Sequence, residues 1–152
     1  MPSRRVSPQG VALIQLFESF VPTVYLCPAG KQTIGYGHVI RPIDSIKPPI
    51  SQEQALDLMR ADLAPIETYL TGVLPGIPQC QFDALASFAY NVGLAALDNS
   101  TLLRKLKAGD VVGAGNAFGV WVYAKVSGKS VILDGLITRR AAERSMFMGA
   151  VV

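Results

Sequence analysis

Apolar residues near the N-terminus recur at the spacing of an α-helix. Ser7-Pro8 supplies an N-cap followed by proline at the first helical position, which is typical of a helix start. Pro22 interrupts the pattern. The apolar face consists of Leu13, Leu16, Phe17 and Phe20. These signals predict a first helix over about residues 8–20, which places Glu18 in its last turn.

The pattern then changes to that of a β-hairpin. Residues 23–38 contain strand formers on either side of Cys27–Gly30, where proline and glycine favour a tight turn. The strand formers are Val24, Tyr25, Ile34 and Tyr36. Residues 39–50 hold three prolines and no helical period, so we expect a loop there with remnants of strand.

A second helix is predicted over about residues 52–70. Ser51 and Gln54 have the spacing of a capping box. Apolar residues follow at intervals of three and four: Leu56, Met59, Leu63, Ile66 and Leu70. Pro65 is expected to kink this helix or to split off its last turn. A helix of this length is a natural link between two lobes.

From Pro78 onward the chain is helical in period. Three apolar segments carry the pattern: Phe82 to Ala89, Leu102 to Leu106, and Ala114 to Val122. Asn91–Gly93 is expected to end the first of them, and Ser127–Lys129 is expected to form a turn. A last helix is predicted from Asp134-Gly135 to about Met148.

Together these elements predict one α+β domain over residues 1–152. A small lobe over about residues 8–50 is joined by the linking helix to an all-helical lobe over about residues 78–148. A length of 152 residues, 50% of them hydrophobic, is typical of a single globular domain with a substantial core.

Composition and charge exclude several classes of protein. The longest apolar runs fall far short of the roughly 20 residues that span a bilayer, so we expect no stable membrane insertion. The N-terminus has a basic start but no apolar h-region, which predicts a protein made and held in the cytoplasm without a signal peptide or signal-anchor. A net charge of +3 is too small to indicate nucleic-acid binding, but it mildly favours an anionic polymer such as a bacterial wall.

The cysteines and the histidine limit the metal and nucleophile chemistry. Cys27 and Cys80 are expected to be reduced thiols in such a compartment, with Cys80 structural. His38 is the only histidine and no Cys-x-x-Cys pair exists, so the sequence predicts no metal site and indicates no cofactor. One alternative remains, a nucleophile pair of Cys27 and His38 as in cysteine peptidases.

One spacing carries the strongest chemical signal. Glu18 is followed after eight residues by Cys27 and after five more by Thr33, directly before Ile34–His38. An acid at a helix end can protonate the leaving oxygen of a glycoside, and a hairpin downstream can present a second group across a cleft. The motif closely resembles that of the phage lysozymes, or endolysins, of glycoside hydrolase family 24, the T-even-phage muramidase type. Similar blocks follow in the family's order at residues 81–85, 87–93, 100–103, 121 and 135–143.

The resemblance implies a lysozyme-like fold, with the substrate cleft between the lobes, and a Glu-Cys-Thr triad. Glu18 would be the general acid and Thr33 would hold the attacking water. Cys27 stands where some family members carry aspartate. Whether it acts as thiol or thiolate stays open, and we expect a water polarised jointly by Cys27 and Thr33.

The resemblance also implies contacts with the substrate. Gly35–His38 is expected to shape the cleft floor, with Tyr36 and His38 as substrate-binding residues and His38 also satisfying hydrogen bonds within the small lobe. Asn91 would bind a sugar or cap its helix.

An arginine of the last helix would pair with the catalytic glutamate. Arg139 and Arg140 are the candidates, and Arg139 could instead form a solvated pair with Glu143 four residues later. Arg140 is favoured because it shares a helix face with Leu136 and Phe147.

The predicted activity is hydrolysis of the β-1,4 bond between N-acetylmuramic acid and N-acetylglucosamine in peptidoglycan, for host cell lysis. A lytic transglycosylase is an alternative, although Thr33 argues against it because that reaction has no attacking water. A non-catalytic cell-wall-binding domain is another. We expect a monomer whose access to the periplasmic or extracellular wall depends on a holin.

Overall fold

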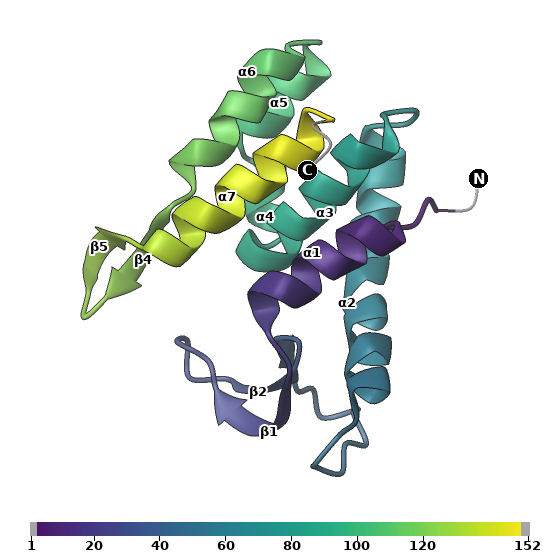
Figure 1. Ribbon diagram of the computed structural model, residues 1–152, viewed down its shortest axis with the longest axis vertical. Coiled ribbons are helices and arrows are strands. Elements are labelled where there is room, and N and C mark those ends of the chain that lie inside the picture. The colour runs from purple at the N-terminus through teal and green to yellow at the C-terminus, as the bar shows by residue number, and fades with distance from the viewer. Residues whose placement is uncertain (1–2, 150–152) are drawn as a thin grey trace.

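The computed structural model describes residues 3–149 and consists of two lobes joined by a long helix (Figure 1). The smaller lobe carries a three-stranded sheet, and the larger lobe is mostly helical. The α+β class and the order of the lobes agree with the prediction. Among the described residues, no helix has the length and apolar character needed to cross a membrane.

The first helix, α1, covers Pro8–Glu18 and ends two residues earlier than predicted. Ser7 caps its start by accepting a hydrogen bond from the Gly10 backbone N–H, as expected from the sequence. Ser19 ends it with a φ of 58°, a left-handed conformation that turns the chain sharply toward the sheet. Glu18 is therefore the last helical residue, at the boundary between the lobes.

The predicted hairpin is present and gains a short third strand. Strands β1 (Val21–Leu26), β2 (Gln32–Gly35) and β3 (His38–Val39) form an antiparallel sheet in that order. Tyr25 pairs with Thr33 across β1 and β2. The intervening turn is closed by a hydrogen bond of 2.8 Å from the Gly30 N–H to the Cys27 carbonyl.

Helix α2 (Gln52–Val73) begins with the predicted capping box at Ser51 and links the lobes. The prediction that Pro65 splits off the last turn is wrong, because the helix continues past it for two turns. Pro65 lies on the exposed face, as does Ala61, whose carbonyl loses its helical partner. Water can satisfy that carbonyl, so the proline is tolerated there.

The larger lobe is built around α3 (Gln79–Val92), in which every residue from 81 to 89 is buried. The other helical elements of this lobe are α4 (Leu94–Asp98), α5 (Thr101–Lys107), α6 (Val111–Ala117), the 3₁₀ turn Phe118–Val120 and α7 (Asp134–Phe147). Helices α1 and α7 both pack on α3 (Figure 1). The first helix therefore packs with the larger lobe, whereas the prediction placed it in the small lobe. Glu18 at its end is thereby brought close to α7.

The larger lobe is not entirely helical, which corrects the prediction. Strands β4 (Tyr123–Val126) and β5 (Lys129–Ile132) form a hairpin that projects from it (Figure 1). The predicted turn is present, with Ser127 at φ 52° and Gly128 at φ 80°. The sequence did not predict these two strands because both faces of the hairpin are largely exposed. The hairpin therefore lacks the alternation of apolar and polar residues that marks a half-buried strand.

Candidate active site

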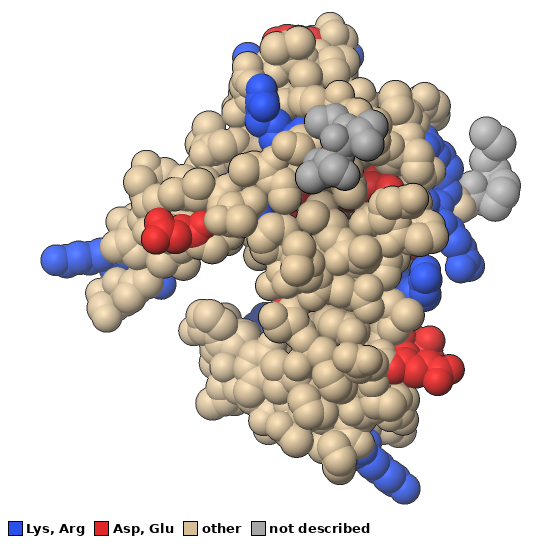
Figure 2. Space-filling view, in the orientation of Figure 1, with Lys and Arg blue, Asp and Glu red and all other residues tan. Residues whose placement is uncertain are grey.

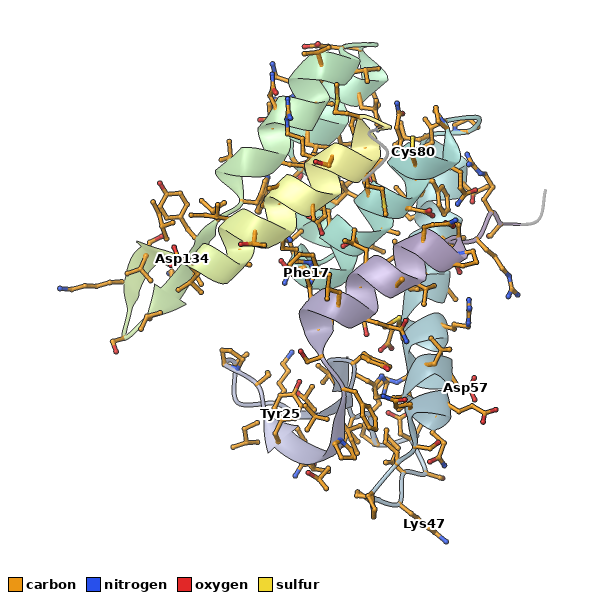
Figure 3. The ribbon with its side chains drawn as sticks, in the orientation of Figure 1. Phe17, Tyr25, Lys47, Asp57, Cys80 and Asp134 are labelled. Atoms are coloured by element: carbon orange, nitrogen blue, oxygen red, sulfur yellow. The ribbon has the colours of Figure 1, made fainter. Side chains whose placement is uncertain are left out.

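A hollow separates the small lobe from the part of the larger lobe that carries α7 and the β4–β5 hairpin (Figure 2). Figure 3 places Phe17 on the side of the larger lobe and Tyr25 on the side of the small lobe. Glu18 follows Phe17 at the end of α1, and Tyr25 lies on β1, so the predicted acid and the predicted hairpin meet at this boundary.

Glu18 is held from two directions. Its Oε2 accepts a hydrogen bond of 2.9 Å from Nη1 of Arg139, which is buried, whereas Glu18 itself remains 19% exposed. Its Oε1 lies against Gly37, where an added Cβ would come within 3.1 Å of that oxygen. Gly37 also has a φ of 79°, so glycine suits both the backbone and the close approach of the carboxylate. One oxygen is thus fixed by a cation and the other faces the small lobe.

Arg139, and not Arg140, pairs with the acid, so the preference for Arg140 was wrong. The face that Arg140 shares with Phe147 points toward α3, and its guanidinium lies over the ring of Phe88, 5.0 Å from the centroid. Arg139 lies on the adjacent face toward α1, with its guanidinium over Phe17. The predicted contact of Arg139 with Glu143 is present but buried rather than solvated.

The hairpin brings Cys27 and Thr33 together at the end of β1 and the start of β2. Both cysteines are free thiols. The Lys31 backbone N–H lowers the pKa of Cys27, chiefly by hydrogen bonding, and the N–H of Ala29 adds to the effect against partial burial. The Thr33 hydroxyl is buried beside the thiol and donates to the Lys31 carbonyl at 2.9 Å. Its lone pairs can still accept a hydrogen bond from water.

Tyr25 is a site residue that the sequence reasoning missed. Burial raises the pKa of its phenol, and the charges of Glu18 and Cys27 raise it further. Tyr25 is therefore within electrostatic reach of both groups. The available signal was its position two residues before Cys27, which places both on the same face of an extended strand.

His38 does not line the hollow, and the prediction that it binds substrate is wrong. Its side chain is 1% exposed, with Nδ1 2.7 Å from Asp62 and Nε2 2.8 Å from Asp44. Burial opposes the charged form, but the hydrogen bonds to the two aspartates outweigh it and raise the pKa of His38. The predicted hydrogen-bonding role is confirmed, with Asp62 contributed by α2. Both ring nitrogens are engaged, so the geometry does not support a pair with Cys27.

Tyr36 and Asn91 differ in accessibility. The Tyr36 ring is buried against Phe20, so the structure does not support the predicted contact between this ring and a sugar. Its backbone carbonyl accepts a hydrogen bond of 2.6 Å from the Tyr90 hydroxyl of α3, which ties the floor of the site to the larger lobe. Asn91 is exposed near the end of α3, and its Oδ1 accepts a 2.7 Å hydrogen bond from Arg140. The helix is capped by Gly93 instead.

A large cavity lies elsewhere. It has a volume of about 870 Å³ and lies between α1, α3 and α7, with Leu13, Leu16 and Met146 in its wall. None of the predicted site residues lines it. Over residues 3–149, no cluster of three or more histidine, cysteine or acidic side chains is placed to hold a metal ion.

The profile of the phage lysozyme family matches residues 15–143, which include Glu18, Cys27, Thr33 and Arg139. The chain belongs to the phage lysozyme family. The endolysin of Acyrthosiphon pisum secondary endosymbiont phage 1 is 41% identical over 95% of this chain and 99% of its own length. The endolysin of Bacillus phage B103 is also 41% identical, but this chain spans only 54% of its length.

A solved structure supports the membership in the phage lysozyme family. The muramidase domain of SpmX from Asticaccaulis excentricus superimposes with a TM-score of 0.86, with 36% identity over 95% of this chain and 98% of that domain. Agreement at this level confirms the lysozyme-like fold that the sequence motif implied.

Proposed function

We propose that this phage lysozyme homologue hydrolyses the β-1,4 bond between N-acetylmuramic acid and N-acetylglucosamine in bacterial peptidoglycan, as an endolysin that lyses a host cell. One observation carries the proposal: the Glu18 carboxylate is fixed by Arg139 at the boundary of the lobes and lies against Gly37, in the same sheet whose first two strands bring Cys27 and Thr33 together. The family membership supports the same reaction class.

Glu18 acts as the general acid in this proposal. Because Oε2 is occupied by Arg139, Oε1 is the oxygen that carries the proton to the leaving glycosidic oxygen. The contact with Arg139 also holds the carboxyl group in one orientation toward the small lobe.

Thr33 and Cys27 orient the attacking water. Thr33 offers lone pairs, since its proton is directed at the Lys31 carbonyl. The Cys27 sulfur accepts a second hydrogen bond from the same water, and the lowered pKa of Cys27 increases the fraction present as thiolate, which accepts hydrogen bonds more strongly than the thiol does. Attack from the hairpin side, opposite the acid, gives an inverted product. The proton that the water loses passes to solvent, and Glu18 regains a proton from solvent before the next turnover.

Product analysis on purified peptidoglycan tests the reaction class. We expect new reducing ends that contain one oxygen from solvent when the digestion is run in heavy-oxygen water. Anhydro-muramic ends without solvent oxygen would instead identify a lytic transglycosylase. Binding to the wall without any turnover would identify a non-catalytic domain.

Two substitutions at Cys27 separate its possible roles. If the sulfur orients water, Cys27→Ser keeps a hydrogen-bonding group and should lower kcat by less than about tenfold, whereas Cys27→Ala should lose about 100-fold. An equal and large loss in both variants would favour a thiolate acting as general base. The pH–activity profile of Cys27→Ser gives an independent readout. If a Cys27 thiolate acts as base, its protonation causes the acidic limb of the wild-type profile, and this limb should be absent in Cys27→Ser.

Delivery is a further part of the proposal. We propose that the chain is held in the cytoplasm as a monomer and reaches the wall through a holin lesion. Cell fractionation with and without a co-expressed holin tests this, and spontaneous appearance in the periplasm would contradict it.

A further inference from the structure

A buried carboxylate lies behind the proposed acid. Glu143 is completely buried on α7. Its Oε2 accepts hydrogen bonds of 2.6 Å from the Ser87 hydroxyl and 3.2 Å from Nε of Arg139. Its Oε1 lies 2.8 Å from Nε of Arg140. Nη2 of Arg140 also donates to Oε2, at 3.5 Å. Glu143 therefore holds both arginines at the same time.

Each arginine then reaches outward to a residue of the proposed site. Arg139 contacts Glu18 through Nη1 at 2.9 Å, while its Nη2 donates to the Ser87 carbonyl at 3.0 Å. Arg140 contacts Asn91 through Nη2 at 2.7 Å. The Nε of each guanidinium lies against Glu143, while Nη1 of Arg139 and Nη2 of Arg140 reach the site, and Nη2 of Arg140 also contacts Glu143. The rigid planar shape of the guanidinium makes the inner contact fix the direction of the outer one.

We propose that Glu143 is a positioning residue that fixes Arg139 against the acid Glu18 and Arg140 against the exposed amide of Asn91. The inference rests on the proposed hydrolase function. Glu143 also balances charge: with it, two guanidinium groups and one internal carboxylate leave a single net positive charge behind Glu18. Without it, the net charge behind Glu18 would rise from one positive charge to two, with only Arg139 in direct contact with the acid, and added positive charge nearby disfavours the proton-donating form of a carboxyl group.

The fold supplies a matched control for a purely structural role. Asp83 is another buried carboxylate, on α3, and it accepts hydrogen bonds from the Ser7 N–H and hydroxyl and from the Gln79 amide. The described contacts of Asp83 include no arginine and no residue of the proposed site. Asp83→Asn should therefore lower stability without changing the pH dependence of turnover.

The test compares Glu143→Gln with Asp83→Asn in a reducing-end assay on peptidoglycan, at temperatures where circular dichroism shows both to be folded. For Glu143→Gln we expect kcat to fall by about 10- to 100-fold. The alkaline limb of its pH–activity profile should also move to lower pH by about one unit. Wild-type kcat and profile in a folded Glu143→Gln protein would overturn the positioning role.

A charge-balanced double variant sharpens the test. Arg140→Gln/Glu143→Gln restores one net positive charge behind Glu18 and removes a buried ion pair as a unit, so it should fold even if Glu143→Gln does not. We expect the alkaline limb of the pH–activity profile to return to the wild-type pH, with KM raised severalfold because Asn91 loses its partner. An alkaline limb that stays displaced, or unfolding of both variants, would overturn the proposal.

The failure of the positioning role can be distinguished from the failure of the proposed function. If the wild-type protein releases no reducing ends, the proposed function is wrong as well. If the wild type is active and Glu143→Gln has the same activity and pH–activity profile, only the positioning role is wrong.

Discussion

The two lobes each contain a buried ionisable group between two opposite charges, with the signs exchanged. In the small lobe, His38 lies between Asp44 and Asp62. In the larger lobe, Glu143 lies between Arg139 and Arg140. Both central side chains are almost completely buried. The arrangement is similar, but one cluster has a titratable cation and the other has cations that keep their protons at any physiological pH.

The two clusters also differ in what they contact. The His38 cluster ties β3 and the following loop to α2, and none of its three members contacts Glu18 among the described hydrogen bonds and ion pairs. In the Glu143 cluster, Arg139 contacts Glu18 directly. We therefore expect the His38 cluster to stabilise the small lobe and the Glu143 cluster to support the acid.

The largest expected effect on stability comes from Glu143→Gln. Removing the shared carboxylate leaves the buried guanidinium of Arg140 without an acidic partner and that of Arg139 paired only with Glu18. This should lower the free energy of unfolding by about 3–5 kcal/mol. Urea unfolding near neutral pH measures the loss. A loss below about 1 kcal/mol would show that the shared carboxylate does not balance the two arginines.

A smaller, pH-dependent loss is expected for His38→Asn. The raised pKa of His38 means that its contribution is fully present below its unfolded-state pKa of about 6.5 and is lost as the pH rises through the folded pKa. The Asp44 pKa of about 2 keeps that partner ionised across this range. The variant should cost about 2–3 kcal/mol near pH 5 and distinctly less near pH 9. Equal losses at both pH values would show that His38 is not charged in the folded protein.

The smallest effect is expected at the contact between the lobes. The Tyr90 hydroxyl donates to the Tyr36 carbonyl at 2.6 Å, and burial raises the pKa of Tyr90, so it stays protonated. Tyr90→Phe should cost about 1 kcal/mol, independent of pH. Combined with His38→Asn, the losses should add within about 0.5 kcal/mol if the two sets of contacts act independently. A larger coupling would mean that the two lobes share one cooperative network.

Local signals in the sequence predicted the helix starts well and the partners of side chains poorly. Ser7-Pro8 and the capping box at Ser51 act within one turn of their own helix, so a single sequence reveals them. The hairpin with Cys27 and Thr33 was similarly local. By contrast, the β4–β5 strands are exposed on both faces and leave no alternation to read.

The choice between Arg139 and Arg140 shows the limit most clearly. Periodicity correctly placed Arg140 with Phe147 on the core face, but that face points to α3 rather than to the acid. The helix that lies beside each face of α7 is determined by packing between segments that are distant in the sequence. The spacing of residues within α7 does not reveal which helix that is. The burial of Glu143 was not predicted for the same reason, since an acid four residues after an arginine usually forms a solvated pair with it.

The most direct test of the central claim is the activity of Glu18→Gln. Glutamine keeps the size of the side chain and can still accept a hydrogen bond from Arg139, but it cannot donate a proton to the leaving oxygen. Glu53→Gln, at an exposed acid in the first turn of α2, is the matched control. With both proteins folded, we predict that Glu18→Gln releases reducing ends from peptidoglycan at least about 1000-fold more slowly than wild type, and that Glu53→Gln matches wild type. An undiminished rate for Glu18→Gln would contradict the assignment of Glu18 as the acid.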